Sequence, residues 1–121
     1  MFLNSFCTCI LLYVVTPPKP YTPRLIHAGS WSLKISFSLP PGADTSKTII
    51  FLVEYRQHQQ TAWQSLPETQ HTTVTITNLD ANMLYVIRVA AKYEGGVLGE
   101  PSNNLEAHTK PGKCCFKRCP R

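Results

Sequence analysis

Hydrophobic and polar positions alternate in several short stretches of the chain, most clearly between residues 85 and 92. Every second side chain there is apolar and is expected on a buried face: Tyr85, Ile87, Val89 and Ala91. The intervening side chains are expected to face solvent: Val86, Arg88, Ala90 and Lys92. A period of two predicts a half-buried β-strand over residues 85–93.

Six further segments have strand character, and turn-forming residues such as the Pro-Pro-Gly cluster at 40–42 separate them. The first contains Pro23, which cannot donate a ladder hydrogen bond, so this strand is expected at a sheet edge. No segment has a helical period. These features predict an all-β fold, a seven-stranded Greek-key β-sandwich. The predicted strands span residues 21–28, 32–39, 48–57, 63–66, 72–77, 85–93 and 104–109.

Leu79 precedes Tyr85 by six residues, a spacing that resembles the tyrosine corner of Greek-key sandwiches. We therefore expect the Tyr85 ring to be buried and its hydroxyl to supply a hydrogen bond to the backbone of residues 79–81. The inward positions of the strands complete the expected core: Leu33, Ile35, Phe37, Phe51, Val53, Tyr55, Val74, Ile76, Leu79, Ile87, Val89 and Leu105.

The order of these motifs resembles the fibronectin type III domain over residues 17–112. The resemblance implies an immunoglobulin-like module that binds protein partners or spaces other modules, without catalysis or a cofactor. Phe37 stands where the family usually places its core tryptophan, and Trp31 is expected at the end of the first loop. The resemblance rests on Pro17–Pro20, Leu33-x-Ile35-x-Phe37 before Pro40-Pro41, Phe51-x-Val53-Glu54-Tyr55-Arg56, Trp63, Leu79…Tyr85, the Gly-rich hairpin and Glu100-Pro-Ser.

Positive charge gathers at the C-terminal end. The 121 residues carry a net charge of +5, but residues 17–112 hold eight Lys or Arg against seven Asp or Glu. The other four cations lie in the last nine residues: Lys113, Lys117, Arg118 and Arg121. A body with a net charge of +1 lacks the basic surface that a phosphate backbone requires, so no nucleic-acid partner is expected.

Both ends differ in composition from the body at 17–112. Residues 1–16 carry no charged side chain, and the apolar run 9–15 is shorter than the roughly 20 residues of a membrane span. A secretory signal would have an apolar run of this length, although no clear cleavage site precedes Pro17. A fragment boundary or a wrongly joined exon would also explain this segment.

The cysteines fall only in the two end segments: Cys7, Cys9, Cys114, Cys115 and Cys119. The body must therefore be stable without an internal disulfide. The tail 113–121 could begin a cysteine-rich module, be an artefactual extension, or be an acylated segment attracted to anionic lipid. Membrane contact is expected only through this tail. Three thiols without a fourth ligand make a poor zinc site, so no metal is expected.

No catalytic motif occurs, and the four histidines lie in separate segments. One candidate protein-binding site is the hairpin loop 94–99, where Val97 and Leu98 stand among glycines. A partner contact would explain them, as would Leu98 folding back to cap the core, and the capping explanation is favoured. The loop lacks Arg-Gly-Asp, so integrin binding by that motif is not expected.

The other candidate is the outer face of strands 48–57 and 85–93, where Arg56 or Arg88 could stack on Trp63. Such a stack resembles the ladders of class I cytokine receptors, although their Trp-Ser-x-Trp-Ser element is missing. A solvated charged face is the simpler expectation.

The sequence thus predicts a non-catalytic protein-binding or spacer module of a secreted or extracellular adhesion, receptor or matrix protein. One alternative is an accessory domain of a larger enzyme, such as a receptor tyrosine kinase or phosphatase. Another is a cytoplasmic module of the cytoskeletal type. The cysteine-free body and the lack of an Asn-x-Ser/Thr sequon both favour that alternative, whereas the apolar start argues against it.

Overall fold

The computed structural model describes residues 15–112; the apolar segment through residue 14 and the basic tail at 113–121 lie outside the described residues. Within them no helix is long and apolar enough to cross a membrane. All seven predicted strands are confirmed, and most are shorter than expected at one or both ends. They are β1 (Arg24–Ala28), β2 (Leu33–Ser36), β3 (Ile49–Gln57), β4 (Gln64–Ser65), β5 (Thr73–Ile76), β6 (Leu84–Tyr93) and β7 (Leu105–His108).

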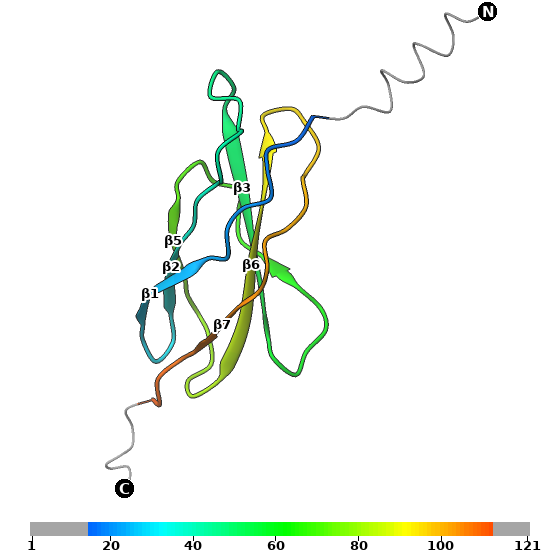
Figure 1. The fold of residues 1–121 in the computed structure, drawn as a ribbon. Helices are drawn as coiled ribbons and strands as arrows, with labels where there is room; N and C mark the ends of the chain where they lie inside the picture. Colours follow the sequence, from blue (N-terminus) through cyan, green and yellow to red (C-terminus); the bar gives the residue numbers. More distant parts are fainter. Residues whose placement is uncertain (1–14, 113–121) are drawn as a thin grey trace, which may run out of the picture.

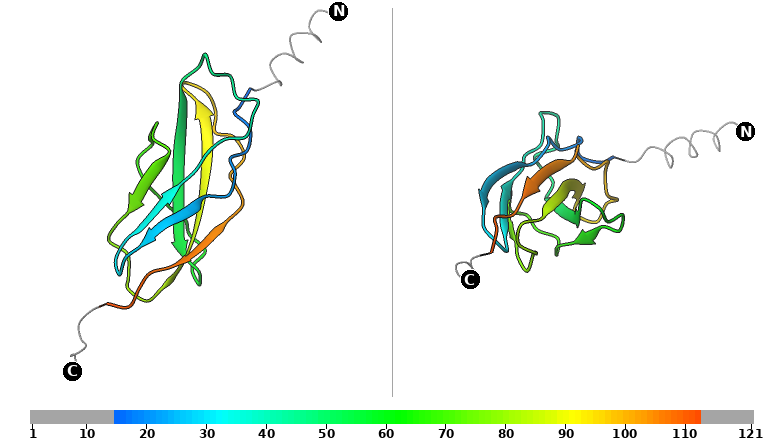
Figure 2. Two further views of the ribbon diagram at one scale, coloured as in Figure 1. Left: turned by 60° about the vertical axis from the view of Figure 1, so that its left-hand side comes forward. Right: turned by 90° about the horizontal axis from the view of Figure 1, so that it is seen from below.

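The strands form two antiparallel sheets that pack face to face as a sandwich (Figures 1 and 2). The smaller sheet has the order β1-β2-β5, and the larger has the order β4-β3-β6-β7. β1 is an edge strand, as predicted, and Pro23 lies immediately before its first residue. The longest pairing joins β3 to β6, from Ile49 opposite Tyr93 to Gln57 opposite Tyr85. This pairing carries both candidate surfaces, one on its outer face and one at the end of β6.

The hydrophobic core lies between the sheets and contains most of the expected side chains. Leu33, Ile35, Ile76, Ile87 and Val89 are fully enclosed. Three expected members are only partly buried and pack at the margin of the core: Tyr55, Val74 and Leu105. For Val74 and Leu105 the reason is their place on β5 and β7, edge strands that are covered by a neighbour on one side only.

The tyrosine corner is present. Tyr85 keeps only 4% of its surface exposed, and Leu79 packs in the same core. The backbone N–H of Asp80 donates a 2.8 Å hydrogen bond to the Tyr85 hydroxyl oxygen. The expected bond to residues 79–81 is therefore confirmed, but its direction is reversed: the hydroxyl accepts from the amide, whereas we expected it to donate to a backbone acceptor.

Two positions of β6 depart from the expected alternation. Val86 and Ala90 were expected to face solvent, but they are 2% and 1% exposed. β6 is an inner strand of its sheet, and Val86 lies between Arg56 of β3 and Glu106 of β7. Long side chains on both flanking strands can cover a smaller one between them, so position on the outer face does not guarantee exposure.

Phe37 fills the position where the family resemblance implies a tryptophan. It is 5% exposed, and its ring meets that of Phe51 edge to face, with centroids 5.0 Å apart and an interplanar angle of 61°. Trp31 lies in the turn between β1 and β2, as expected, with 56% of its surface exposed. The indole is therefore not available to the core, which has a pair of phenylalanines instead.

The chain enters the sandwich at one end and leaves it at the opposite end (Figure 1). The incoming segment is extended, and its residues Pro17 and Pro20 are buried. Tyr21 donates its backbone N–H to the carbonyl oxygen of Ser38 at 3.1 Å, which joins the segment to the smaller sheet. The hairpin loop between β6 and β7 lies at this same end.

Candidate functional site

The hairpin loop after β6 presents two exposed apolar side chains. Gly95 has a φ of +78°, which favours glycine, and the N–H of Gly96 donates to the carbonyl oxygen of Tyr93 at 2.8 Å. After this turn, Val97 and Leu98 are 55% and 43% exposed. Leu98 is not a member of the buried core, so the expectation that it caps the core is wrong. We call Val97 and Leu98 the hairpin patch.

The hairpin patch rests on a fixed base. Gly99 donates its N–H to the carbonyl oxygen of Ala91 at 2.9 Å, which ties the loop to β6. A Cβ at Gly99 would lie 3.2 Å from the carbonyl oxygen of Ala91 and 3.3 Å from the Cβ of Thr16, so a larger residue here would force these neighbours to shift. Lys19 and Glu100 form an exposed ion pair with 3.9 Å between Nζ and Oε2. The loop therefore packs against the incoming segment, and the patch points outward from it.

The outer face of β3 and β6 carries a cation–π stack, the alternative to the solvated charged face that was the simpler expectation. The guanidinium carbons of Arg88 and Arg56 lie 4.0 Å and 4.7 Å from the ring centroid of Trp63. The indole thus has two cations instead of the one that the sequence suggested. We call Trp63, Arg56, Arg88 and Glu54 the outer-face ladder.

Both cations of the outer-face ladder already have polar partners inside the domain. Arg88 donates from Nε to Oε1 of Glu54 at 2.8 Å in a pair that is mostly buried. Arg56 donates from Nη1 to the carbonyl oxygens of His58 and Gln60 at 3.2 Å and 2.6 Å. These bonds hold the β3–β4 loop and the indole against the sheet, so the geometry accounts for the ladder as a brace within the fold.

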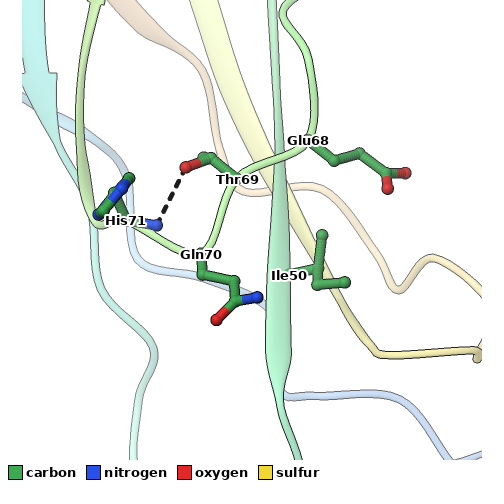
Figure 3. Close-up of a pocket in the computed structure, with 5 residues that line it drawn as sticks. All are labelled: Ile50, Glu68, Thr69, Gln70 and His71. Atoms are coloured by element: carbon green, nitrogen blue, oxygen red, sulfur yellow. Dashed lines mark hydrogen bonds between the residues drawn. The ribbon is translucent and has the colours of Figure 1, made fainter.

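A shallow hollow beside β3 is the remaining candidate on this face, and Figure 3 shows its lining. Thr69 bridges to Phe51 through two backbone hydrogen bonds of 2.7 Å and 3.0 Å, which bring the segment Glu68–His71 alongside β3. Glu68 already pairs with Lys92 at 3.0 Å, and its side chain and that of His71 do not converge. Within residues 15–112 no group of three His, Cys, Asp or Glu side chains could hold a metal ion.

A titratable group lies in the loop before β3, at the same end of the domain as the hairpin patch. Asp44 accepts hydrogen bonds at Oδ1 from the hydroxyl and the N–H of Ser46, at 2.6 Å and 3.0 Å. The Ser46 hydroxyl, followed by its amide, lowers the pKa of this carboxyl from its ordinary value. Asp44 in turn donates its N–H to the buried Tyr93 hydroxyl at 2.9 Å. A carboxylate that stays ionised suits a turn rather than proton transfer near neutral pH.

A third cluster, which no sequence pattern predicted, lies at the end where the chain leaves. Trp31, Ser30 and Gly112 meet there, because the residues after β7 bond to the β1–β2 turn. The available signal was a large aromatic residue in a predicted turn, a position where polar residues are the norm.

Two face-to-face antiparallel sheets with a tyrosine corner define an immunoglobulin-like β-sandwich. The family model of the fibronectin type III domain matches residues 17–108, and the chain belongs to this family. Domains of this family are in general non-catalytic modules that bind partners or space other domains.

Similar proteins agree with this assignment. The chain is 27% identical over 99 residues to mouse fibronectin type III domain containing protein 3C1, across 81% of this chain and 7% of that protein. The solution structure of the fibronectin type III domain of human fibronectin type III domain containing protein 3 superposes with a TM-score of 0.75 at 23% identity, covering 84% of this chain and 94% of that one. A structure of titin kinase and its flanking domains superposes with a TM-score of 0.67 at 24% identity, covering 78% of this chain and 17% of that one. The two structural likenesses show the fold.

Proposed function

We propose that this domain binds a protein partner through the hairpin patch, as one module of a longer extracellular adhesion, receptor or matrix protein. The observation that carries the proposal is the exposure of Val97 and Leu98, 55% and 43%, on a loop held by Gly99 against the incoming segment. Apolar side chains that point outward from a fixed base suit a partner with an apolar pocket.

The outer-face ladder is the weaker candidate for the same role. Its two cations are satisfied by Glu54 and by backbone carbonyls of the β3–β4 loop, so a partner would have to replace bonds already made. The hairpin patch has no such competition, because apolar groups gain from any contact that removes them from water.

A binding comparison with matched variants tests the hairpin patch. Val97→Ser with Leu98→Ser is expected to weaken capture of the partner from cell-surface proteins about tenfold or more, as loss of a central apolar contact does. The matched control is Ile26→Ser with Leu25→Ser on β1, because these side chains are 52% and 41% exposed and lie elsewhere. The control should bind like the wild type.

Other outcomes of this comparison would contradict the proposal. Equal binding by the hairpin pair and the wild type, with loss on Trp63→Leu, would move the contact to the outer-face ladder. Binding that disappears only when residues 113–121 are deleted would indicate a charge-driven association instead, because the four clustered cations lie there.

The spacer role has its own support. The chain enters and leaves at opposite ends of the sandwich, which suits modules joined in a row (Figure 1). The mouse relative is far longer than this chain, and the titin structure holds a kinase with flanking domains. The likeness to the titin structure favours the alternative that this domain is an accessory unit of a larger enzyme.

The extracellular location is tested by the mass of the mature protein. If residues 1–16 act as a secretory signal, the intact mass of protein made in a eukaryotic host should lack about 15 residues at the N-terminus. The protein should then also be recovered from the medium. A retained Met1 in protein from the cytosol would contradict secretion and favour the cytoskeletal-type module.

A further inference from the structure

The outer face of the smaller sheet is polar at its regular outward positions. Leu33 and Ile35 of β2 are fully buried, so the alternate side chains of this strand point away from the core. The register places residues of β1 and β5 beside these outward side chains on the same face (Figure 1). We call this set the small-sheet face: Arg24 and His27 of β1, Lys34 and Ser36 of β2, and Thr73 and Thr75 of β5.

The charged side chains of the small-sheet face are all basic. None of the seven acidic residues, which all lie within 15–112, falls on β1, β2 or β5. Among the residues that the structure describes, the carboxylate contacts of cations and histidines lie elsewhere: Lys19–Glu100, His58–Glu106, Arg88–Glu54 and Lys92–Glu68. The net charge of +1 for residues 17–112 therefore averages over an acid-free face, where a positive potential attracts anions.

A hollow of about 400 Å³ opens on this side of the domain and shares Arg24 and Ser36 with the small-sheet face. Its volume is within the usual range of ligand sites. Tyr21 is 55% exposed, so its ring is open to contact. Hydroxyl groups both donate and accept hydrogen bonds, and a cation binds an anionic group, so this lining suits a ring that carries both kinds of substituent. The lining residues are Tyr21, Thr22, Arg24, Ser36, Phe37 and Ser38.

The composition of the small-sheet face distinguishes between classes of anionic partner. A phosphate backbone requires a dense row of cations, but this face has two Lys or Arg side chains among its hydroxyl groups. A protein partner would require an apolar centre, and none of the residues of this face is apolar. A sulfated polysaccharide carries hydroxyl groups on its sugar rings and separate sulfate groups, and it therefore matches both features of the face.

The two cations are spaced to hold different groups of one polysaccharide chain. Arg24 lies opposite Ser36, which is two residues along β2 from Lys34. A strand separation of roughly 4.8 Å and a rise of roughly 3.3 Å per residue place the Cα atoms of Arg24 and Lys34 about 8 Å apart. Thr73 and Thr75 continue the same two rows across β5. Two long side chains at this spacing reach separate sulfate groups, with hydroxyl groups beside them for the sugars.

We propose that the small-sheet face binds a sulfated polysaccharide, with Arg24 and Lys34 bound to its sulfate groups and one sugar ring in the hollow. The hydroxyl groups of Ser36, Thr73 and Thr75 supply hydrogen bonds to the sugars. This site goes beyond the contact proposed for the hairpin patch, because it lies on the other sheet and takes a different class of partner. Its test does not depend on that contact.

Titration of the full chain with a heparin oligosaccharide tests the two cations. Arg24→Gln with Lys34→Gln is expected to weaken binding about tenfold or more, because each change removes a charge-assisted hydrogen bond. The matched control is Lys47→Gln with Lys110→Gln, since both side chains are exposed, lie outside this face and carry the same charge. The control should change the affinity by less than about threefold. Residues 113–121 are identical in both proteins, so the difference between the two variants reports on the face.

A second pair of variants separates a sugar site from a general anion site. Thr73→Val with Thr75→Val keeps the shape and charge of the face but removes two hydroxyl groups. This change is expected to weaken binding of the heparin oligosaccharide about threefold or more and to leave binding of polyglutamate unchanged. Thr45→Val with Thr61→Val is the matched control, because both threonines are exposed and lie in loops, and it should bind like the wild type.

The melting temperatures of all variants should stay within about 2 °C of the wild type, because every changed side chain is exposed. Equal losses of heparin affinity for the two glutamine variants would overturn the proposal, because binding would then follow net charge. Threonine variants that bind the heparin oligosaccharide like the wild type would also overturn it. So would polyglutamate or a DNA oligonucleotide that binds the wild type as tightly as the heparin oligosaccharide does.

Discussion

Replacement of Phe37 by alanine is expected to lower the free energy of unfolding by about 3–5 kcal/mol. The ring is 5% exposed and meets Phe51 edge to face across the interior. Alanine removes the apolar ring from the core and leaves a cavity, because side chains on two packed sheets relax only in part. A loss of this size is a large share of the roughly 5–15 kcal/mol that holds a domain folded.

Urea unfolding measures this loss, and an unchanged dependence on denaturant would show that the comparison is valid. Val97→Ala is the matched control, because Val97 is 55% exposed and its truncation should change stability by no more than about 0.5 kcal/mol. The loss of unfolding free energy for Phe37→Leu should lie between those of Phe37→Ala and Val97→Ala. This third variant keeps the test usable if the alanine variant does not fold. A loss below about 1 kcal/mol for Phe37→Ala would contradict the placement of this ring.

Tyr85→Phe should cost about 1–2 kcal/mol, although the ring itself remains. The lost hydroxyl accepts the Asp80 N–H at 2.8 Å and a longer 3.4 Å bond from Gln57. Without it the amide of Asp80 has no acceptor in a partly buried corner, and an unpaired buried N–H costs more than the bond itself gains.

Hydrogen exchange gives this prediction a local readout. The Asp80 amide should exchange faster in Tyr85→Phe, and the melting temperature should fall at the same time. Tyr21→Phe is the control, because Tyr21 is 55% exposed and its change should alter neither quantity. Protection of the Asp80 amide that survives the substitution would mean that another group accepts its hydrogen bond.

The fold was predictable because its strongest signals are local and periodic. The period of two along β2 and β3 assigned Leu33, Ile35, Phe51 and Val53 to the core, and the structure buries all four. The spacing from Leu79 to Tyr85 predicted the corner because that motif is contained within one loop and one strand. Patterns of this kind depend on neighbours in the chain, which the sequence displays directly.

The remaining features depend on neighbours in space. Val86 is buried on an inner strand, between Arg56 and Glu106 on the adjacent strands, and no periodicity along β6 carries that information. Leu98 was expected to cap the core, but a loop has no period that would decide its direction. The cluster of Trp31, Ser30 and Gly112 joins residues about 80 positions apart, and only the closed sandwich brings them together.

The outer-face ladder could be predicted from the sequence only in part. The positions of its arginines could be predicted from the sequence, because Arg56 and Arg88 occupy outward positions on two predicted strands, which the structure pairs. The sequence could not predict that both cations stack on Trp63 or that Arg56 donates to loop carbonyls, since these contacts depend on how the β3–β4 loop folds back.

The opposite placement of the two chain ends has a mechanical consequence. A force that pulls the ends apart draws β1 along β2 and β7 along β6, because each terminal strand runs lengthwise beside its partner (Figure 1). The β6–β7 pairing has four consecutive residue pairs, and the β1–β2 pairing has four pairs with a register shift between Leu25 and His27. Both are then loaded in shear, so the hydrogen bonds of each pairing resist together and do not open one after another. The domain is therefore oriented to carry tension between whatever is attached at its two ends.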